Sequence, residues 1–233
     1  MLLYRYPHEA DITLHAKMSV SELKHQGQFT DDGESDFLPS IPDFMRTGEE
    51  TADRPSGGMI PGGAVRGTAY HRVLELLKFR EIRSYKELTA ALRQLEEDGM
   101  MPAESLRLVD RRKLLTFFES PLAERMRRAD EQGRLHKESQ FVMGIPASMM
   151  DEADSDEPVL IQGIIDAWFE EEDGIVLVDY KTDRVGEGEE QVLLDRYQIQ
   201  LVYYAQALSQ ITGKKVKESF IYSLTLQKEI SVF

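Results

Sequence analysis

The chain contains 233 residues, 41% of them hydrophobic, which is enough to enclose a substantial core in one large domain or two small ones. Its formal net charge of −14 argues against a stand-alone DNA-binding protein, because contacts to phosphates normally come from a basic face. The sequence contains no cysteine, which excludes disulfides, thiolate catalysis and cysteine-ligated zinc or iron–sulfur clusters, so any metal must be held by carboxylates and histidine.

The N-terminal part of the chain carries few signals of regular structure. In Met18–Gln26, Ser19 as an N-cap and Glu22 three residues later form a capping box, which predicts a short helix. From there to about Gly63 the sequence is rich in Gly, Pro, Asp and Ser, as is typical of a long connector or a partly disordered insertion. No run approaches the about 18 apolar residues of a membrane-spanning helix, and no secretion signal is evident, so we expect a soluble protein that is not exported.

A helical layer is predicted next. After "PGGAVRGT", residues Val73, Leu74 and Leu77 form the apolar stripe of a helix. Further helices are expected at about 85–98, 103–119 and 121–131.

The remaining sequence alternates between strands and one helix. "HKESQFVMGIPA" predicts a strand near residue 138, and the acidic run "DEADSDEP" that follows is interpreted as a solvated hairpin loop. "VLIQGIIDAWFE" and "IVLVDYKT" predict two strands joined across "EEDG", both apolar at consecutive positions, as is typical of strands covered on both faces. "YQIQLVYYAQALSQITG" predicts a helix ended by Gly213, and "VKESFIYSL" a last strand. Together these elements indicate an α/β fold with a mixed central sheet flanked by helices.

Two opposite charges end the second of these apolar strands. Side chains two residues apart in a strand point to the same face, so Asp179 and Lys181 share one side of the sheet and Tyr180 faces the other. The position of Asp166 depends on the turn. A two-residue loop at 172–173 places it opposite Asp179, one at 173–174 places it opposite Lys181, and a three-residue loop pairs it with Tyr180.

The simplest interpretation of Asp179 and Lys181 is a structural salt bridge. Other polar side chains favour a site instead. His71 and Glu75 lie four residues apart on one helix, and Gln200 and Tyr204 repeat that spacing on the late helix, so each pair shares a face. A structural histidine and an amphipathic boundary remain the alternatives for these two pairs.

Hard oxygen ligands with one imidazole suit Mg²⁺ or Mn²⁺ better than zinc or calcium. The chemistry indicated is attack of water on a phosphodiester, with the metal lowering the pKa of the water. Lys181 would orient or help to deprotonate that water, or stabilise negative charge.

With these residues identified, five stretches resemble the motifs of the C-terminal nuclease domain of the bacterial RecB/AddA helicase-nucleases, most closely the AddA type. "RGTAYHRVLELL" is similar to G-T-x-x-H-x-x-L, and "KESQF" to the strand that bears a glutamate. "QGIIDAWFE" and "LVDYKTDR" resemble G-x-(I/V)-D and D-Y-K-(T/S), and "YQIQLVYYAQAL" resembles Q-x-x-x-Y. The resemblance implies a PD-(D/E)XK restriction-endonuclease-like fold, with residues 1–63 as a linker and wrapping segment and residues 64–233 as the nuclease domain.

Carried over to this sequence, the resemblance implies that His71, Asp166 and Asp179 are side-chain metal ligands. The backbone carbonyl of Tyr180 becomes a fourth ligand. The implied cofactor is Mg²⁺, which Mn²⁺ can replace, without an iron–sulfur cluster.

The remaining motif residues receive catalytic or supporting roles. Lys181 corresponds to the catalytic lysine of the PD-(D/E)XK signature, acting with Asp166 and Asp179. Gln200 and Tyr204 would position the substrate or support the site, and Glu138 would lie at its edge.

The function that the resemblance implies is a Mg²⁺-dependent deoxyribonuclease, an exonuclease that processes double-strand breaks for recombinational repair. No G-x-x-x-x-G-K-[ST] motif is present, so the chain is expected to be a domain excised from a longer protein. Expected partners are single-stranded DNA, superfamily 1 helicase domains of the same full-length chain and a protein of the AddB type, in the bacterial cytoplasm at the nucleoid. Two alternatives remain: a catalytically silent module that docks on a partner protein and guides DNA, and a metal-dependent phosphohydrolase for small substrates.

Overall fold

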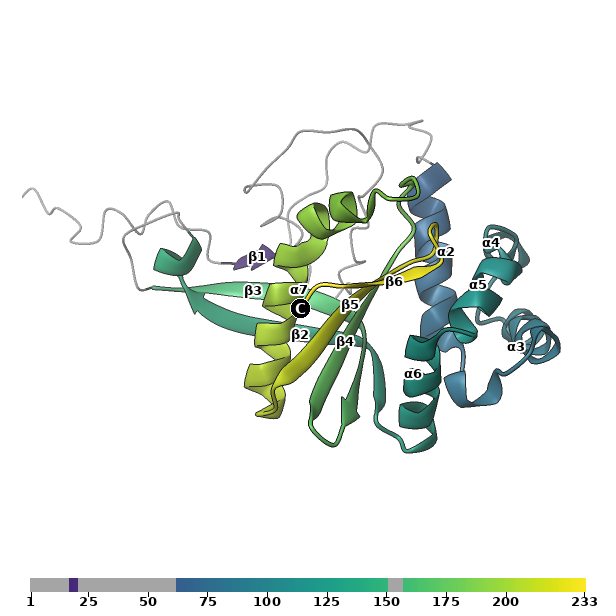
Figure 1. Cartoon of the computed structure of the whole chain (residues 1–233), viewed down its shortest axis with the longest axis horizontal. Helices are drawn as coiled ribbons and strands as arrows, with labels where there is room; N and C mark the ends of the chain where they lie inside the picture. The colour runs from purple at the N-terminus through teal and green to yellow at the C-terminus, as the bar shows by residue number, and fades with distance from the viewer. Residues whose placement is uncertain (1–16, 21–61, 151–156) are drawn as a thin grey trace, which may run out of the picture.

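The computed structural model describes residues 17–20, 62–150 and 157–233. These residues form three layers, in which a mixed sheet lies between helices α2–α6 on one face and helix α7 on the other (Figure 1). The predicted α/β class with a central mixed sheet is therefore confirmed. The predicted connector at about 27–63 and most of the acidic run "DEADSDEP" lie outside the described residues.

The helical layer follows the predicted order with one correction. Its helices are α2 (Gly62–Leu76), α3 (Tyr85–Glu97), α4 (Ala103–Arg107), α5 (Arg111–Phe118) and α6 (Pro121–Glu131), with a 3₁₀ turn η3 at Phe79–Glu81. The single helix predicted at 103–119 is wrong, because the chain breaks at Asp110. The carboxylate of Asp110 caps α5 by accepting hydrogen bonds from the backbone N–H groups of Arg112 and Lys113, and its own N–H donates to the hydroxyl of Tyr70.

The sheet has six strands: β1 (Lys17–Ser19), β2 (Leu135–Pro146), β3 (Pro158–Glu171), β4 (Gly174–Lys181), β5 (Val216–Ser223) and β6 (Lys228–Ser231), with a 3₁₀ turn η4 (Ala147–Met150) after β2. The order is β1-β3-β4-β5-β6, and β2 pairs with the other edge of β3. The pairs β1–β3 and β4–β5 are parallel and the others antiparallel. Lys17–Ser19 pair with Leu160–Gln162 as a strand that was not predicted. Val20, the residue after the predicted N-cap Ser19, is helical, and the rest of the predicted short helix lies outside the described residues.

The long strand β3 divides one of its edges between two partners. Residues 160–162 pair with β1, whereas residues 167–171 pair with β4, and the stretch 163–166 lies between them. Because β1 runs parallel to β3 and β4 runs antiparallel, the carboxyl ends of β1 and β4 point toward each other across this interruption. Ligands of open α/β sheets bind in crevices of this kind, outside the carboxyl ends of strands.

Two apolar cores hold the layers together. Odd-numbered β4 residues such as Leu177 face α7 (Glu190–Thr212), whereas Val176, Val178 and Tyr180 face helices α2–α6. Strand β4 is buried at every position between its ends, as its unbroken apolar pattern predicted. Helix α7 ends at Gly213 in the left-handed conformation, with φ of 69°, which confirms the predicted C-cap.

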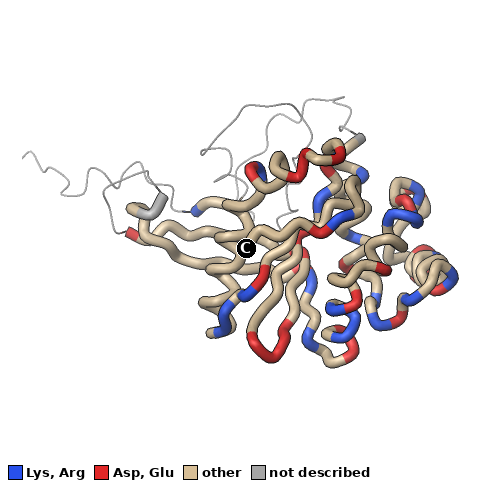
Figure 2. Tube along the Cα trace, in the orientation of Figure 1, with Lys and Arg blue, Asp and Glu red and all other residues tan. Residues whose placement is uncertain are grey.

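The tip of the β3–β4 hairpin is acidic, and two of its carboxylates pair with neighbouring cations. Acidic residues colour this turn in Figure 2, whereas Lys and Arg alternate with Asp and Glu along α3–α6. Arg125 of α6 donates two hydrogen bonds of 2.9 Å to Glu171, and the ammonium of Lys217 on β5 lies 2.5 Å from a carboxylate oxygen of Asp173. These contacts fasten the turn to both neighbouring elements.

Gly163, in the interruption of β3, provides a test of the packing. A Cβ atom there would lie 2.7 Å from Cε1 of Phe141 and 3.1 Å from Cε1 of Tyr204, so Gly163→Ala should lower the free energy of unfolding by about 1–3 kcal/mol. Gly144→Ala in the same hairpin is the matched control, because its nearest atom would be Cβ of Pro158 at 3.8 Å. Urea unfolding measures both, and equal stability of the two variants would contradict this packing.

Candidate metal centre

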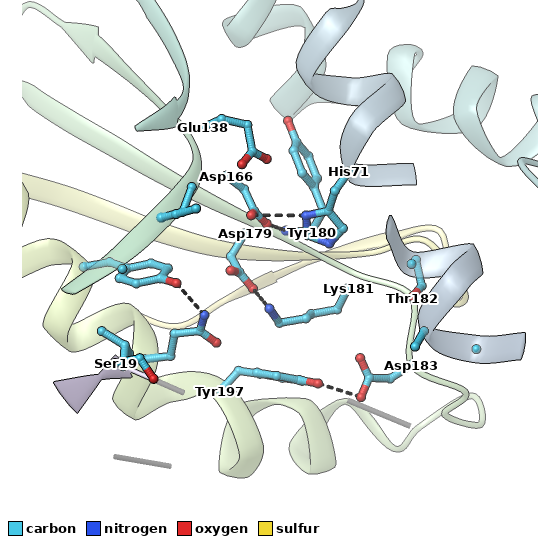
Figure 3. Close-up of a pocket in the computed structure, with 18 of the residues that line it drawn as sticks. Ser19, His71, Glu138, Asp166, Asp179, Tyr180, Lys181, Thr182, Asp183 and Tyr197 are labelled. Atoms are coloured by element: carbon cyan, nitrogen blue, oxygen red, sulfur yellow. Dashed lines mark hydrogen bonds and ion pairs between the residues drawn. The ribbon is translucent and has the colours of Figure 1, made fainter. Parts of the chain in front are cut away.

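A cleft opens where the edge of β3 is interrupted, between α2 and α7 (Figure 3). Ser19 and Val20, at the end of β1, and Gln162 form part of its wall. The residues expected to act at the site all line this cleft: His71, Glu138, Asp166, Asp179, Tyr180, Lys181, Gln200 and Tyr204. Glu75, which four-residue spacing grouped with His71, is not among the lining residues, and its carboxylate pairs with Arg72. The structure thus brings together residues from α2, β2, β3, β4 and α7.

Helix α2 presents His71 with small residues before it. Gly63 and Gly67 precede His71 at four-residue spacing, so all three share the face of the helix that lines the cleft. A Cβ atom at Gly67 would lie 3.1 Å from Oγ1 of Thr182, so glycine allows α2 to approach the end of β4 without displacing this hydroxyl. The sequence "GGAVRGT" therefore creates space next to the histidine.

The carboxyl end of α2 is fastened to β2 by Lys137. The ammonium of Lys137 donates to the carbonyl oxygens of Leu77, at 2.7 Å, and of Glu75. A cation at this end also complements the helix dipole. Because Glu138 follows Lys137 directly, this contact places the histidine of α2 and the glutamate of β2 relative to each other.

Asp166 occupies the point where β3 and β4 separate. Their ladder ends at Ala167 and Val178, and beyond it the Asp166 carboxylate accepts a hydrogen bond of 2.8 Å from the backbone N–H of Tyr180. The other carboxylate oxygen lies 3.2 Å from Nδ1 of His71. The hairpin loop lies at 172–173, the register for which Asp166 was expected opposite Asp179. The backbone pairing stops one position before that pair, and the hydrogen bond from Tyr180 N–H to the Asp166 carboxylate takes its place.

Glu138 reaches the cleft through an unusual backbone conformation. Its φ is 48°, in the left-handed region, while Lys137 and Ser139 on either side keep their pairing with β3. Left-handed backbone is uncommon for residues other than glycine and costs of order 1 kcal/mol. One ligand atom each from Glu138, His71 and Asp166 lie within 4.8 Å of one another. Glu138, expected at the edge of the site, is thus grouped with two of the expected ligands.

Asp179 and Lys181 point together into the α7 side of the cleft, as the strand pattern predicted. The ammonium of Lys181 lies 2.7 Å from Oδ2 of Asp179. The Asp179 side chain is only 1% exposed, and neither of its oxygens accepts a hydrogen bond with good geometry from the described residues. Asp179 and Lys181 therefore form an ion pair, and the buried Asp179 carboxylate could still accept further hydrogen bonds or bind a cation.

Helix α7 closes the cleft with a row of polar side chains. The amide of Gln200 donates a hydrogen bond of 2.7 Å to the hydroxyl of Tyr204. Two further residues were missed in the sequence analysis: the hydroxyl of Tyr197 donates to Asp183 at 2.7 Å, and both line the cleft. The signal was available, because Tyr197 lies three and seven residues before Gln200 and Tyr204 and so shares their helix face.

The charges in the cleft shift one another's pKa values. Burial opposes charge on His71, but the neighbouring Asp166 carboxylate raises the pKa of the imidazole above its usual value. Burial likewise opposes charge on Asp166, yet attraction to His71 lowers the pKa of this carboxyl overall. For Asp179, burial prevails over Lys181 and raises the pKa. Burial, reinforced by Asp166, raises the pKa of Glu138 to about 7.

The donor set of the cleft fits a divalent cation that prefers oxygen ligands. The imidazole of His71 is grouped with the carboxylates of Glu138 and Asp166, and the carboxylate of Asp179 lines the same cleft outside this group. Such a donor set suits Mg²⁺ or Mn²⁺. Burying a carboxylate is expensive unless its oxygens are paired, hydrogen-bonded or bound to a metal. Asp179 pairs with Lys181, but its oxygens accept no well-formed hydrogen bond from the described residues, which is the strongest observation for such a cation.

The sequence comparisons agree with this geometry. The family model of the PD-(D/E)XK nuclease superfamily matches residues 44–231. Proteins described as subunits of ATP-dependent helicase/nucleases are similar over nearly the whole chain. The one from Lachnoclostridium phytofermentans is 33% identical, covering 99% of this chain and 22% of its own length, and the one from Clostridium beijerinckii is 33% identical, covering 100% and 19%. The chain thus spans about a fifth of the length of these relatives.

Among the described residues, no helix combines the length and apolar character needed to cross a membrane.

The raised pKa of Glu138 predicts a pH dependence of stability in metal-free buffer. The folded chain keeps a proton up to about pH 7 that the unfolded chain releases near the ordinary pKa of 4.5. The stabilisation from this proton is complete at low pH and is lost as the pH rises through about 7. Glu138→Gln cannot lose a proton, so above pH 7 it should be more stable than the wild type by up to about 3 kcal/mol.

Urea unfolding between pH 4.5 and 8, with a chelator present, measures this difference. Glu97→Gln, at an exposed position of α3, is the matched control and should follow the wild type throughout. A constant difference between Glu138→Gln and the wild type across this range would contradict the raised pKa.

Proposed function

Because the chain belongs to the PD-(D/E)XK nuclease superfamily, we propose that its cleft hydrolyses phosphodiester bonds of single-stranded DNA with bound Mg²⁺. One observation carries the proposal: the oxygens of the buried Asp179 carboxylate, beside Lys181, accept no well-formed hydrogen bond from the described residues. This carboxylate lines the same cleft as the group of His71, Asp166 and Glu138. A structural salt bridge would not require the imidazole and the two further carboxylates.

The residues that would hold the cation are His71, Asp166 and Asp179, with the backbone carbonyl of Tyr180. Glu138 joins this proposal because its carboxylate is grouped with His71 and Asp166. A bound divalent cation supplies Lewis-acid chemistry, which lowers the pKa of a water and neutralises charge that develops on the phosphate. Strand β4 contributes a rigid, dry support, since its side chains are buried on both faces.

Lys181 is the proposed catalytic lysine. Burial opposes its charge, but Asp179 raises the pKa of the ammonium, so Lys181 is positively charged at neutral pH. A charged ammonium cannot accept a proton in this state, and its role is to orient the attacking water and to stabilise negative charge on the phosphate. Gln200 and Tyr204 would position the DNA strand from the facing helix.

The proposed context is a longer helicase-nuclease that processes double-strand breaks for recombinational repair in the bacterial cytoplasm. Helicase domains of the same polypeptide and a partner protein of the AddB type would deliver the strand. The relatives named above support this context, since they are described as helicase/nuclease subunits and are about five times longer. The net charge of −14 also supports it, because a chain this acidic would need other parts of the protein to bring DNA to its cleft. Lys and Arg alternate with Asp and Glu along the trace of α3–α6 (Figure 2).

Asp179→Asn tests the proposal while preserving the shape of the side chain. Loss of the carboxylate should reduce Mg²⁺-dependent cleavage of a single-stranded oligonucleotide by more than the about 10- to 100-fold typical of an outer-shell partner. Calorimetry with Mn²⁺ should show a weakened site in the same variant, and circular dichroism should show an unchanged fold.

Asp195→Asn, at an exposed position of α7, is the matched control and should cleave and bind Mn²⁺ like the wild type. Wild-type binding of Mn²⁺ without any cleavage of DNA would favour the small-substrate phosphohydrolase, which nucleotides and phosphate esters would then reveal. A chain that shows neither Mn²⁺ binding through Asp179 nor cleavage would be the catalytically silent docking module.

A further inference from the structure

The ammonium of Lys181 lies between two different partners. On one side is Oδ2 of Asp179, at 2.7 Å, and on the other is the ring of Tyr197, whose centroid is 4.3 Å from Nζ (Figure 3). Ammonium groups within about 6 Å of a ring centroid are attracted by the negative face of the ring, most strongly when they are shielded from water. The Lys181 side chain is 13% exposed, so this attraction is only weakly screened.

Tyr197 is itself firmly placed. Its side chain is buried on α7, and its hydroxyl donates a hydrogen bond of 2.7 Å to Oδ1 of Asp183, two residues beyond Lys181. Arg196 donates to the same oxygen at 2.7 Å. Burial raises the pKa of Tyr197, so the hydroxyl stays protonated and remains a donor. The ring is therefore attached both to α7 and to the segment that follows β4.

We propose that Tyr197 is a positioning residue whose ring fixes the ammonium of Lys181 for the reaction. The contribution to the rate rests on the proposed nuclease function. The fixed position of the ammonium does not rest on it, because the distances to Asp179 and Tyr197 define that position directly.

Two physical arguments favour a ring at this position. The lysine side chain has four flexible bonds, so one ion pair leaves the ammonium free to swing about the carboxylate. A ring face attracts the charge without a lone pair of its own, so N–H groups remain available for a water or a phosphate oxygen. A second carboxylate in the place of Tyr197 would instead use those N–H groups.

The ring contact also matters because Asp179 is a proposed metal ligand. A carboxylate shared between a cation and an ammonium holds the ammonium less tightly than one that serves it alone. With a cation bound to Asp179, the ring of Tyr197 would still attract the Lys181 ammonium from the side opposite Asp179. Simple core packing of Tyr197 would predict no dependence of the lysine on the aromatic character of its neighbour.

Nuclear magnetic resonance of the 233-residue chain with labelled lysine tests the position directly, in metal-free buffer. The Lys181 Cε protons, assigned by their disappearance in Lys181→Arg, should be shifted upfield by the ring in the wild type and in Tyr197→Phe. Tyr197→Leu should lose this shift, whereas Tyr203→Leu, the same substitution on α7 outside the cleft lining, should keep it. An unchanged Lys181 resonance in Tyr197→Leu would overturn the proposal.

Cleavage kinetics test the consequence for catalysis. Tyr197→Leu should lower kcat about tenfold with little change in KM, which corresponds to the loss of one cation–ring contact. Tyr197→Phe should restore most of kcat, because it keeps the ring and loses only the bond to Asp183. Equal losses in the Phe and Leu variants would overturn the role of the ring.

The two proposals fail in different ways. A wild-type chain that cuts no oligonucleotide would refute the proposed function, whereas the lysine resonance would still decide whether Tyr197 fixes the ammonium. Circular dichroism and urea unfolding of Tyr197→Leu show whether the variant folds, and Tyr197→Phe keeps the test decisive if it does not.

Discussion

The hydrogen bond from the Tyr180 backbone N–H to the Asp166 carboxylate is the contact on which the cleft depends. At this point β3 and β4 stop pairing through their backbones, and the Asp166 carboxylate accepts the hydrogen bond of the Tyr180 N–H, which has no backbone partner on β3. An unpaired backbone donor buried here would cost about 1–3 kcal/mol, so the carboxylate is fixed by the requirement of the sheet itself. The same group approaches His71, and α2 is thereby joined to the sheet at the floor of the cleft.

The elements around this contact lose their regularity where the cleft requires it. Glu138 adopts a left-handed backbone while Lys137 and Ser139 remain paired with β3. Opposite this point, the other edge of β3 changes its partner from β1 to β4. Local strain of this kind persists only where the surroundings determine it, and here Lys137 does so by binding the carboxyl end of α2. Two irregularities of the sheet, the left-handed Glu138 and the change of partner along β3, thus lie at the carboxylates.

Much of this arrangement was predictable from local patterns. The unbroken apolar run of β4 indicated its burial, the two-residue period placed Asp179 and Lys181 on one face, and the four-residue period placed the polar side chains of α7. The break at Asp110 and the strand at Lys17–Ser19 were not predicted, because each depends on a partner distant in sequence: Tyr70 for the first and Leu160–Gln162 for the second. The left-handed Glu138 has no sequence signal of the Gly or Asn kind.

The balance of charge inside the cleft explains why the acidic composition and the proposed chemistry are compatible. His71 and Lys181 are the cationic side chains that line the cleft with Glu138, Asp166 and Asp179, and Arg72 acts on Glu138 from outside the lining, so the carboxylates of the lining outnumber its cations. The raised pKa of Glu138 reflects this excess as well as burial, since a proton on one carboxyl removes its repulsion with Asp166. A divalent cation would remove the same repulsion and favour the charged form of all three groups. On the proposed function, a proton and a divalent cation would therefore compete for one site, and the excess of carboxylates that makes the metal-free cleft hold a proton would also suit it to a metal.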